Sequence, residues 1–165
     1  MAFKCNFLVI LLLSMAAVGF ANKIVGGGNE NNATNFAGGR SGSSSNTIVV
    51  GGPENWHFGF NYTNWAFQTY PFYIKDTLVF KFDPPNGTNF PHSVYMFRDF
   101  WSFMRCDLRR AKLVANVSQG GGEGFKFVMK KWQPYYFACG ERAGFHCKVG
   151  LMKFAVFPLP RYHIH

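Results

Sequence analysis

The chain has 165 residues and a formal net charge of +9 at pH 7. This length is enough for one domain. A positive charge fits an anionic polymer, a membrane surface or a nucleic acid as a partner. The basic residues are scattered, however, and no nucleic-acid recognition motif is present, so nucleic acid is the disfavoured partner. The twenty phenylalanines are expected to fill the interior of a small domain.

The N-terminus has the features of an export signal. Lys4 is the only charged residue before an apolar run at positions 7–13, and a stretch rich in small residues follows and ends at Ala21. We predict a signal peptide over residues 1–21 and a secreted, extracellular protein. The apolar run is shorter than the ~20 residues that span a bilayer. The C-terminus lacks the hydrophobic tail of a lipid-anchor signal.

The mature chain is predicted to have three parts. Residues 22–46 are rich in Gly, Asn and Ser with few residues suited to a core, which is typical of a flexible linker. Residues 47–158 carry the hydrophobic pattern of a folded domain, and residues 159–165 form a C-terminal tail.

The domain is expected to be all-β. Short runs with β-type composition are separated by Gly, Pro and Asn turns, at positions 48–50, 77–82, 93–96, 125–129, 135–139 and 153–157. Such a series favours a β-sandwich or barrel. Only Phe97, Trp101, Met104 and Leu108 have helical spacing, which predicts one short helix near Cys106.

The cysteine count is odd once the leader is removed. Cys5 leaves with the signal peptide, so Cys106, Cys139 and Cys147 remain. In oxidising surroundings two of the three are expected to pair, and the third is free, intermolecular or bound to another group. Four glycosylation sequons agree with export; they begin at Asn32, Asn61, Asn86 and Asn116.

The candidate site lies near the C-terminus. Cys139, His146 and Met152 fall in one Gly-bounded loop, and His92 begins a strand upstream. A thiolate, two imidazoles and a weak axial thioether are the donors of a mononuclear copper site that transfers electrons. Zinc on the same Cys and His residues is the nearest alternative. Paired catalytic carboxylates, a phosphate-binding loop and a nucleophile elbow are not found.

The motifs around these residues resemble the phytocyanins, the plant blue copper proteins of the cupredoxin superfamily. The resemblance covers about residues 47–158. The matching segments are Val50-Gly51-Gly52 with Trp56, Trp65-Ala66, Lys75-Asp76, His92-Ser93-Val94, Cys106, Tyr136-Phe137-Ala138-Cys139, Phe145-His146-Cys147 and Gly150-Leu151-Met152-Lys153. Most of these segments are weak signals alone, but together and in this order they are specific.

The resemblance implies a Greek-key β-sandwich of the cupredoxin type. It implies one type 1 copper on His92, Cys139 and His146, and a disulfide between Cys106 and Cys147. The competing pairing of Cys139 with Cys147 would consume the metal thiolate. The implied activity is one-electron transfer by a monomer that is not an enzyme and acts with an unidentified redox partner. The positive charge suggests an anionic cell-wall polymer as a further partner.

Two departures from the family pattern bear on the site. Six residues separate Cys139 from His146, more than in most phytocyanins. The axial position falls on Leu151 when counted from His146, and on Met152 when counted back from Lys153. Adjacent strand residues project oppositely, so only one of the two can face the metal, and Met152 is preferred. The alternative function is a copper-free extracellular glycoprotein that uses the same sandwich for interaction.

Overall fold

The structure is a computed structural model that describes residues 44–161. The predicted signal peptide, Asn32 and all but the last three residues of the predicted linker lie outside this range. The first described strand begins at Thr47, next to the expected start of the domain.

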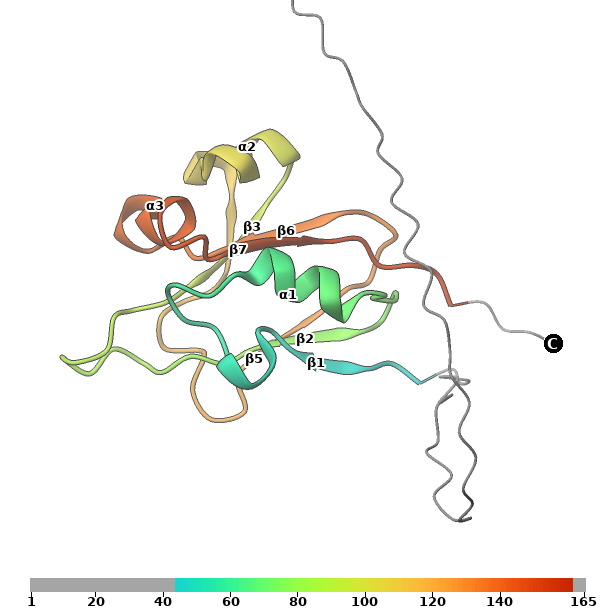
Figure 1. The fold of residues 1–165 in the computed structure, drawn as a ribbon, viewed down its shortest axis with the longest axis horizontal. Helices are drawn as coiled ribbons and strands as arrows, with labels where there is room; N and C mark the ends of the chain where they lie inside the picture. The colour runs from blue at the N-terminus through green and yellow to red at the C-terminus, as the bar shows by residue number, and fades with distance from the viewer. Residues whose placement is uncertain (1–43, 162–165) are drawn as a thin grey trace, which may run out of the picture. The chain divides into compact units, whose positions relative to one another are not determined.

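Seven strands form two sheets (Figure 1). The three-stranded sheet has the order β1 (Thr47–Val49), β2 (Thr77–Phe80) and β5 (Phe125–Val128). The four-stranded sheet has the order β4 (Lys112–Ala115), β3 (Val94–Phe97), β6 (Tyr135–Ala138) and β7 (Lys153–Val156). Among these strands the β1–β2 pair is parallel and the other pairs are antiparallel. The predicted sandwich is therefore confirmed.

Helices are more numerous than predicted. The structure has α1 (Tyr62–Thr69), α2 (Phe100–Arg105) and α3 (Glu141–Lys148), with short 3-10 turns η1 (Gly52–Glu54) and η2 (Leu108–Arg110). Only α2 matches the single helix expected near Cys106. No helix within residues 44–161 is long and apolar enough to cross a membrane.

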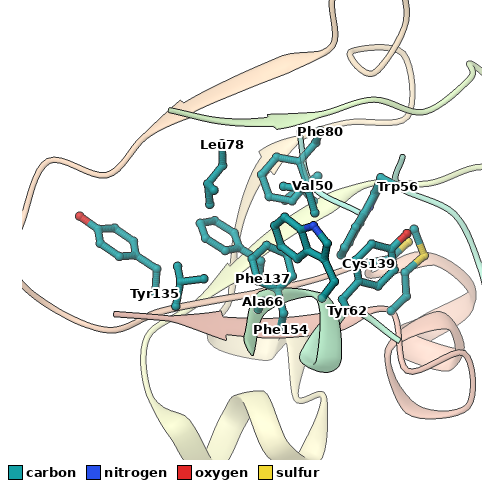
Figure 2. Packing of buried hydrophobic residues seen from close by; sticks show 14 of the residues in the cluster. Val50, Trp56, Tyr62, Ala66, Leu78, Phe80, Tyr135, Phe137, Cys139 and Phe154 are labelled. Carbon is teal, nitrogen blue, oxygen red and sulfur yellow. The ribbon is translucent and has the colours of Figure 1, made fainter. Parts of the chain in front are cut away.

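Aromatic side chains fill the space between the sheets (Figure 2). The Trp56 ring meets Phe80 edge-on at 5.3 Å, and Phe137 lies 5.4 Å from Phe80 and 5.5 Å from Phe154. All four side chains are buried. The phenylalanines thus fill the interior of the domain, as expected from the sequence. Cys139 lies at the end of this cluster away from Tyr135 (Figure 2).

Strands β3 and β6 determine where the candidate site forms. They pair antiparallel with Tyr95 opposite Ala138, so the residues just before β3 lie beside those just after β6. His92 precedes β3 by two residues, and Cys139 follows β6 directly. The sheet thus brings together two side chains that are 47 positions apart.

Backbone and side-chain contacts extend beyond both predicted domain boundaries. The buried Asp76 carboxylate accepts hydrogen bonds from the Asn46 and Tyr73 amides and pairs with Arg161. Leu159 also pairs with the backbone beside Tyr73. Asp76 therefore connects the two ends of the described chain.

Candidate metal centre

His92, Cys139 and His146 converge at one end of the sandwich. One ligand atom from each lies within 4.8 Å of the others. The Cys139 Sγ atom is 3.9 Å from Nδ1 of His92 and 3.4 Å from Nδ1 of His146. The three residues are 8%, 0% and 3% exposed. They form the only metal-ligating cluster of His, Cys, Asp and Glu found in the described residues.

The spacing of these atoms fits a shared metal ion. A first-row ion bonded to sulfur at ~2.3 Å and to nitrogen at ~2.0 Å separates those atoms by roughly 3.7 Å at a trigonal angle. The observed separations of 3.4 and 3.9 Å bracket that value. Cys139 is also the free cysteine of the described chain, so its sulfur is not engaged in a disulfide.

Backbone hydrogen bonds connect the loop that carries the donors. The Cys139 amide donates to the Met152 carbonyl at 3.0 Å, and the Met152 amide donates to the His146 carbonyl at 3.1 Å. Cys139, His146 and Met152 are therefore held in one hydrogen-bonded unit that joins the end of β6 to the start of β7.

Ser93 makes a second connection, which sequence reasoning missed. Its amide donates to Cys139 Sγ at 3.5 Å, and its hydroxyl accepts from the Gly140 amide at 3.3 Å. Its carbonyl accepts from the Trp56 indole at 3.1 Å. These contacts join segments far apart in the sequence, so no local signal could have revealed them.

Met152 and Leu151 occupy different environments. Met152 is fully buried, whereas Leu151 is 54% exposed and has a positive φ of 50°. Both residues precede β7, which begins at Lys153, so the alternation expected of strand residues does not apply to them. Met152 is the one of the two that lies inside the domain beside the cluster.

The long segment between Cys139 and His146 forms most of α3. Arg142, Ala143 and Gly144 inside it have positive φ values, so the helix is kinked rather than regular. Cys147, near its end, is bonded to Cys106 at the end of α2, with Cα atoms 5.9 Å apart. This is the pairing that the resemblance implies, and it fixes the backbone next to His146.

An aromatic ring packs against one of the two histidines. The Phe58 ring meets His146 edge-on at 5.2 Å and stacks on Phe145 at 6.0 Å. A Cβ on Gly150 would lie 2.3 Å from the Phe58 ring, so only glycine permits this approach. The Arg142 guanidinium of α3 lies over the Phe90 ring at 5.0 Å. A groove of about 590 Å³ lined by Phe58, Phe90 and His92 opens here.

Burial also sets the protonation of the donors. Burial is the largest cause that lowers the pKa of His92 to about 4, with smaller contributions from His146 and His57. Burial likewise lowers the pKa of His146, partly offset by Glu141, and raises the pKa of the Cys139 thiol. At neutral pH both imidazoles are therefore neutral and have a lone pair for a metal.

Three of the four predicted sequons lie in the described chain. Asn61, Asn86 and Asn116 are all exposed. Asn61 caps the N-terminus of α1, and the other two side chains accept hydrogen bonds from the Thr88 and Ser118 hydroxyls of their own sequons. Exposure is compatible with glycosylation.

Comparison with solved structures identifies the fold. The structure is similar to that of cucumber stellacyanin with Cu²⁺ at pH 7.0, at a TM-score of 0.55 and 22% identity, over 72% of this chain and all of that one. The match to spinach plantacyanin covers 70% of this chain and all of that one, at 21% identity and a TM-score of 0.46. No family model and no curated protein matches the chain. The predicted resemblance to phytocyanins is confirmed at the level of the fold.

Proposed function

We propose that this chain is a phytocyanin that binds one type 1 copper and transfers single electrons. His92, Cys139 and His146 would be the ligands, and Met152 the axial donor. The observation that carries the proposal is a buried, unpaired thiol with two imidazole Nδ1 atoms at 3.4 and 3.9 Å. Copper supplies a centre that cycles between two oxidation states, for which this donor set is suited.

The chain contributes fixed donor positions. Ser93 hydrogen-bonds to the Cys139 sulfur, and the carbonyl of Met152 accepts from the Cys139 amide. The disulfide at Cys147 restrains the residue next to His146. Donors held in this way change little in position between two metal charges, which keeps the reorganisation that accompanies electron transfer small.

Burial argues against a hydrolytic zinc site. A hydrolytic zinc site keeps one position open for water, but all three donors here are less than 9% exposed and the Phe58 ring packs against His146. Glu141 lies close enough to influence the pKa values of Cys139 and His146, yet it is not part of the ligand cluster. We therefore propose an electron carrier rather than an enzyme.

The proposal includes a secreted, monomeric plant glycoprotein. The charge and apolar pattern of residues 1–21 support export, and exposure of Asn61, Asn86 and Asn116 supports glycosylation. The redox partner would approach the groove beside His92, because this end of the domain lies closest to the metal donors.

A copper titration of the purified protein tests the proposal. An intense blue colour with cupric ion is expected from the parent protein, because Cys139 would supply the thiolate of a copper–thiolate bond. Cys139→Ser should lose the colour while keeping the far-UV circular dichroism of a folded protein. Blue colour in that variant would contradict the ligand assignment. A colourless parent supports the copper-free alternative, and tight binding of zinc without a coloured copper complex supports the zinc alternative.

A further inference from the structure

A second concave feature lies at the other end of the four-stranded sheet. It is a pocket of about 530 Å³. Its lining comes from the end of β3, the turn before β4 and the turn before β6: Met96, Phe97, Arg98, Arg110, Ala111, Lys112, Gln133 and Pro134. Three of these eight residues are cationic and none is acidic, so the pocket has a positive lining.

The three cations of this pocket are not neutralised by ion pairs. Arg98, Arg110 and Lys112 are exposed, and none has a carboxylate partner within 4.0 Å in residues 44–161. Arg110 contributes to the lowered pKa of Asp99, so this carboxylate is within electrostatic range. Its oxygens, however, accept from the Ser102 amide at 2.9 Å and the Ser102 hydroxyl at 2.8 Å, where they cap α2.

Exposed aromatic rings follow the pocket along the chain. Phe100 and Trp101 begin α2 immediately after Arg98 and Asp99, and they are 47% and 67% exposed. Their rings lie 5.6 Å apart, and Phe100 also contacts Tyr136, two residues after Pro134. Figure 1 shows α2 outside the sheet rather than between the sheets. Phe100 thus lies two residues after the pocket residue Arg98 in the chain.

The pocket and the metal centre occupy opposite ends of the same two strands. His92 and Cys139 lie before β3 and after β6, whereas Arg98 and Pro134 lie after β3 and before β6. A four-residue strand spans about 10 Å at ~3.3 Å per residue. A ligand in the pocket would therefore leave the end with the metal donors free for a redox partner.

We propose that this pocket, defined by Arg98, Arg110 and Lys112, binds the carboxylates of an acidic polysaccharide. Arginine pairs with carboxylates through two parallel hydrogen bonds, and lysine adds a point charge. The exposed rings of Phe100 and Trp101 offer flat apolar surfaces on which sugar rings can pack. A single polymer chain can enter a hollow, whereas the surface of a bilayer cannot, which favours a polysaccharide over a membrane. The inference does not depend on copper.

Salt elution from immobilised polygalacturonate tests the proposal. The pocket variant combines Arg98→Gln, Arg110→Gln and Lys112→Gln. The matched control combines Lys75→Gln, Lys81→Gln and Lys126→Gln, which removes the same charge around β2 and β5 of the other sheet. We expect the pocket variant to bind polygalacturonate about tenfold or more weakly than the control, and so to elute at lower salt, because it loses charge-assisted hydrogen bonds.

The possible outcomes distinguish a specific binding site from binding that depends only on net charge. Equal weakening in the two variants would mean that net charge alone governs binding and would overturn the proposal. Retention of the parent protein on neutral dextran would also overturn the proposal. So would a pocket variant that loses binding to phosphatidylserine vesicles but keeps binding to polygalacturonate. Circular dichroism checks that both variants are folded. Copper-loaded and copper-free parent protein should bind polygalacturonate equally well. The binding experiment can therefore be interpreted even if the copper titration fails.

Discussion

The rings of Phe58 and Phe145 stack with only 5° between their planes, although the two residues come from separate segments. Phe145 belongs to α3, and Phe58 lies in the turn before α1. Because Phe58 also touches the His146 ring, this pair screens one donor from solvent. The long insertion between Cys139 and His146 thus supplies half of a cover over the site.

Removal of Phe58 should open the site to small anions. In copper-loaded Phe58→Ala, added azide is expected to change the visible spectrum, because the His146 side is no longer covered. The parent protein and Phe100→Ala, which removes an exposed ring on α2, should show little change at the same azide concentration. A parent spectrum that responds as strongly as the variant would contradict a screening role for the pair.

Met152 should set the reduction potential, and Leu151 should not. Met152→Leu nearly conserves volume at a fully buried position, so its cost in stability is less than about 1.5 kcal/mol. Loss of the thioether removes the weak axial donor and should raise the potential measured by voltammetry. Leu151→Ala changes a side chain that is half exposed and serves as the control. A larger shift in Leu151→Ala would reverse the axial assignment.

Ser93→Ala should destabilise the copper-free protein. The Ser93 hydroxyl is the acceptor for the Gly140 amide in a buried environment, and an unsatisfied buried donor costs about 1–3 kcal/mol. Urea denaturation measures the change in the free energy of unfolding. Ser102→Ala is the comparison, because its hydroxyl bonds to exposed Asp99. A difference of less than about 0.5 kcal/mol between the two variants, the usual range for surface changes, would remove the structural role given to Ser93.

The disulfide should contribute strongly to stability. Cys106 and Cys147 are 41 positions apart, and closing a loop of that length stabilises the folded state by about 4 kcal/mol in the chain-entropy model. The Cys106→Ala/Cys147→Ala double variant should therefore unfold at lower denaturant concentration. It should also bind copper more weakly, since α3 loses its connection to α2. An unchanged midpoint would be incompatible with this bond in the purified protein.

The sequence predicted the parts of the fold that depend on strong local patterns. Six strands were expected near their observed positions because each alternates or is apolar, and the runs 48–50, 135–139 and 153–157 stop directly before Gly or Pro. Strand β4 was missed, since Lys112 and Leu113 are exposed and the segment has no clear alternation. Helix α1 was missed because it buries only Tyr62, Trp65 and Ala66, and its start depends on the Asn61 cap.

The donor residues of the candidate site were also predictable, since thiol, imidazole and thioether groups stand out in any sequence. The surroundings were not. Helix α3 contains three residues with positive φ and has no helical pattern, so it was interpreted as a loop. The contacts of Ser93 and the stacking of Phe58 on Phe145 join segments far apart in sequence, and no local signal encodes them.

The complete burial of Cys139 affects how the protein can be handled. In the copper-free protein, burial raises the pKa of this thiol and favours its protonated form, and its position in the core denies access to oxidants and to other thiols. Within residues 44–161 the remaining cysteines are already joined to each other. Folded protein stored in air should therefore keep this thiol unoxidised, and an alkylating reagent should not modify it. Unfolding in denaturant should make the thiol reactive toward the same reagent.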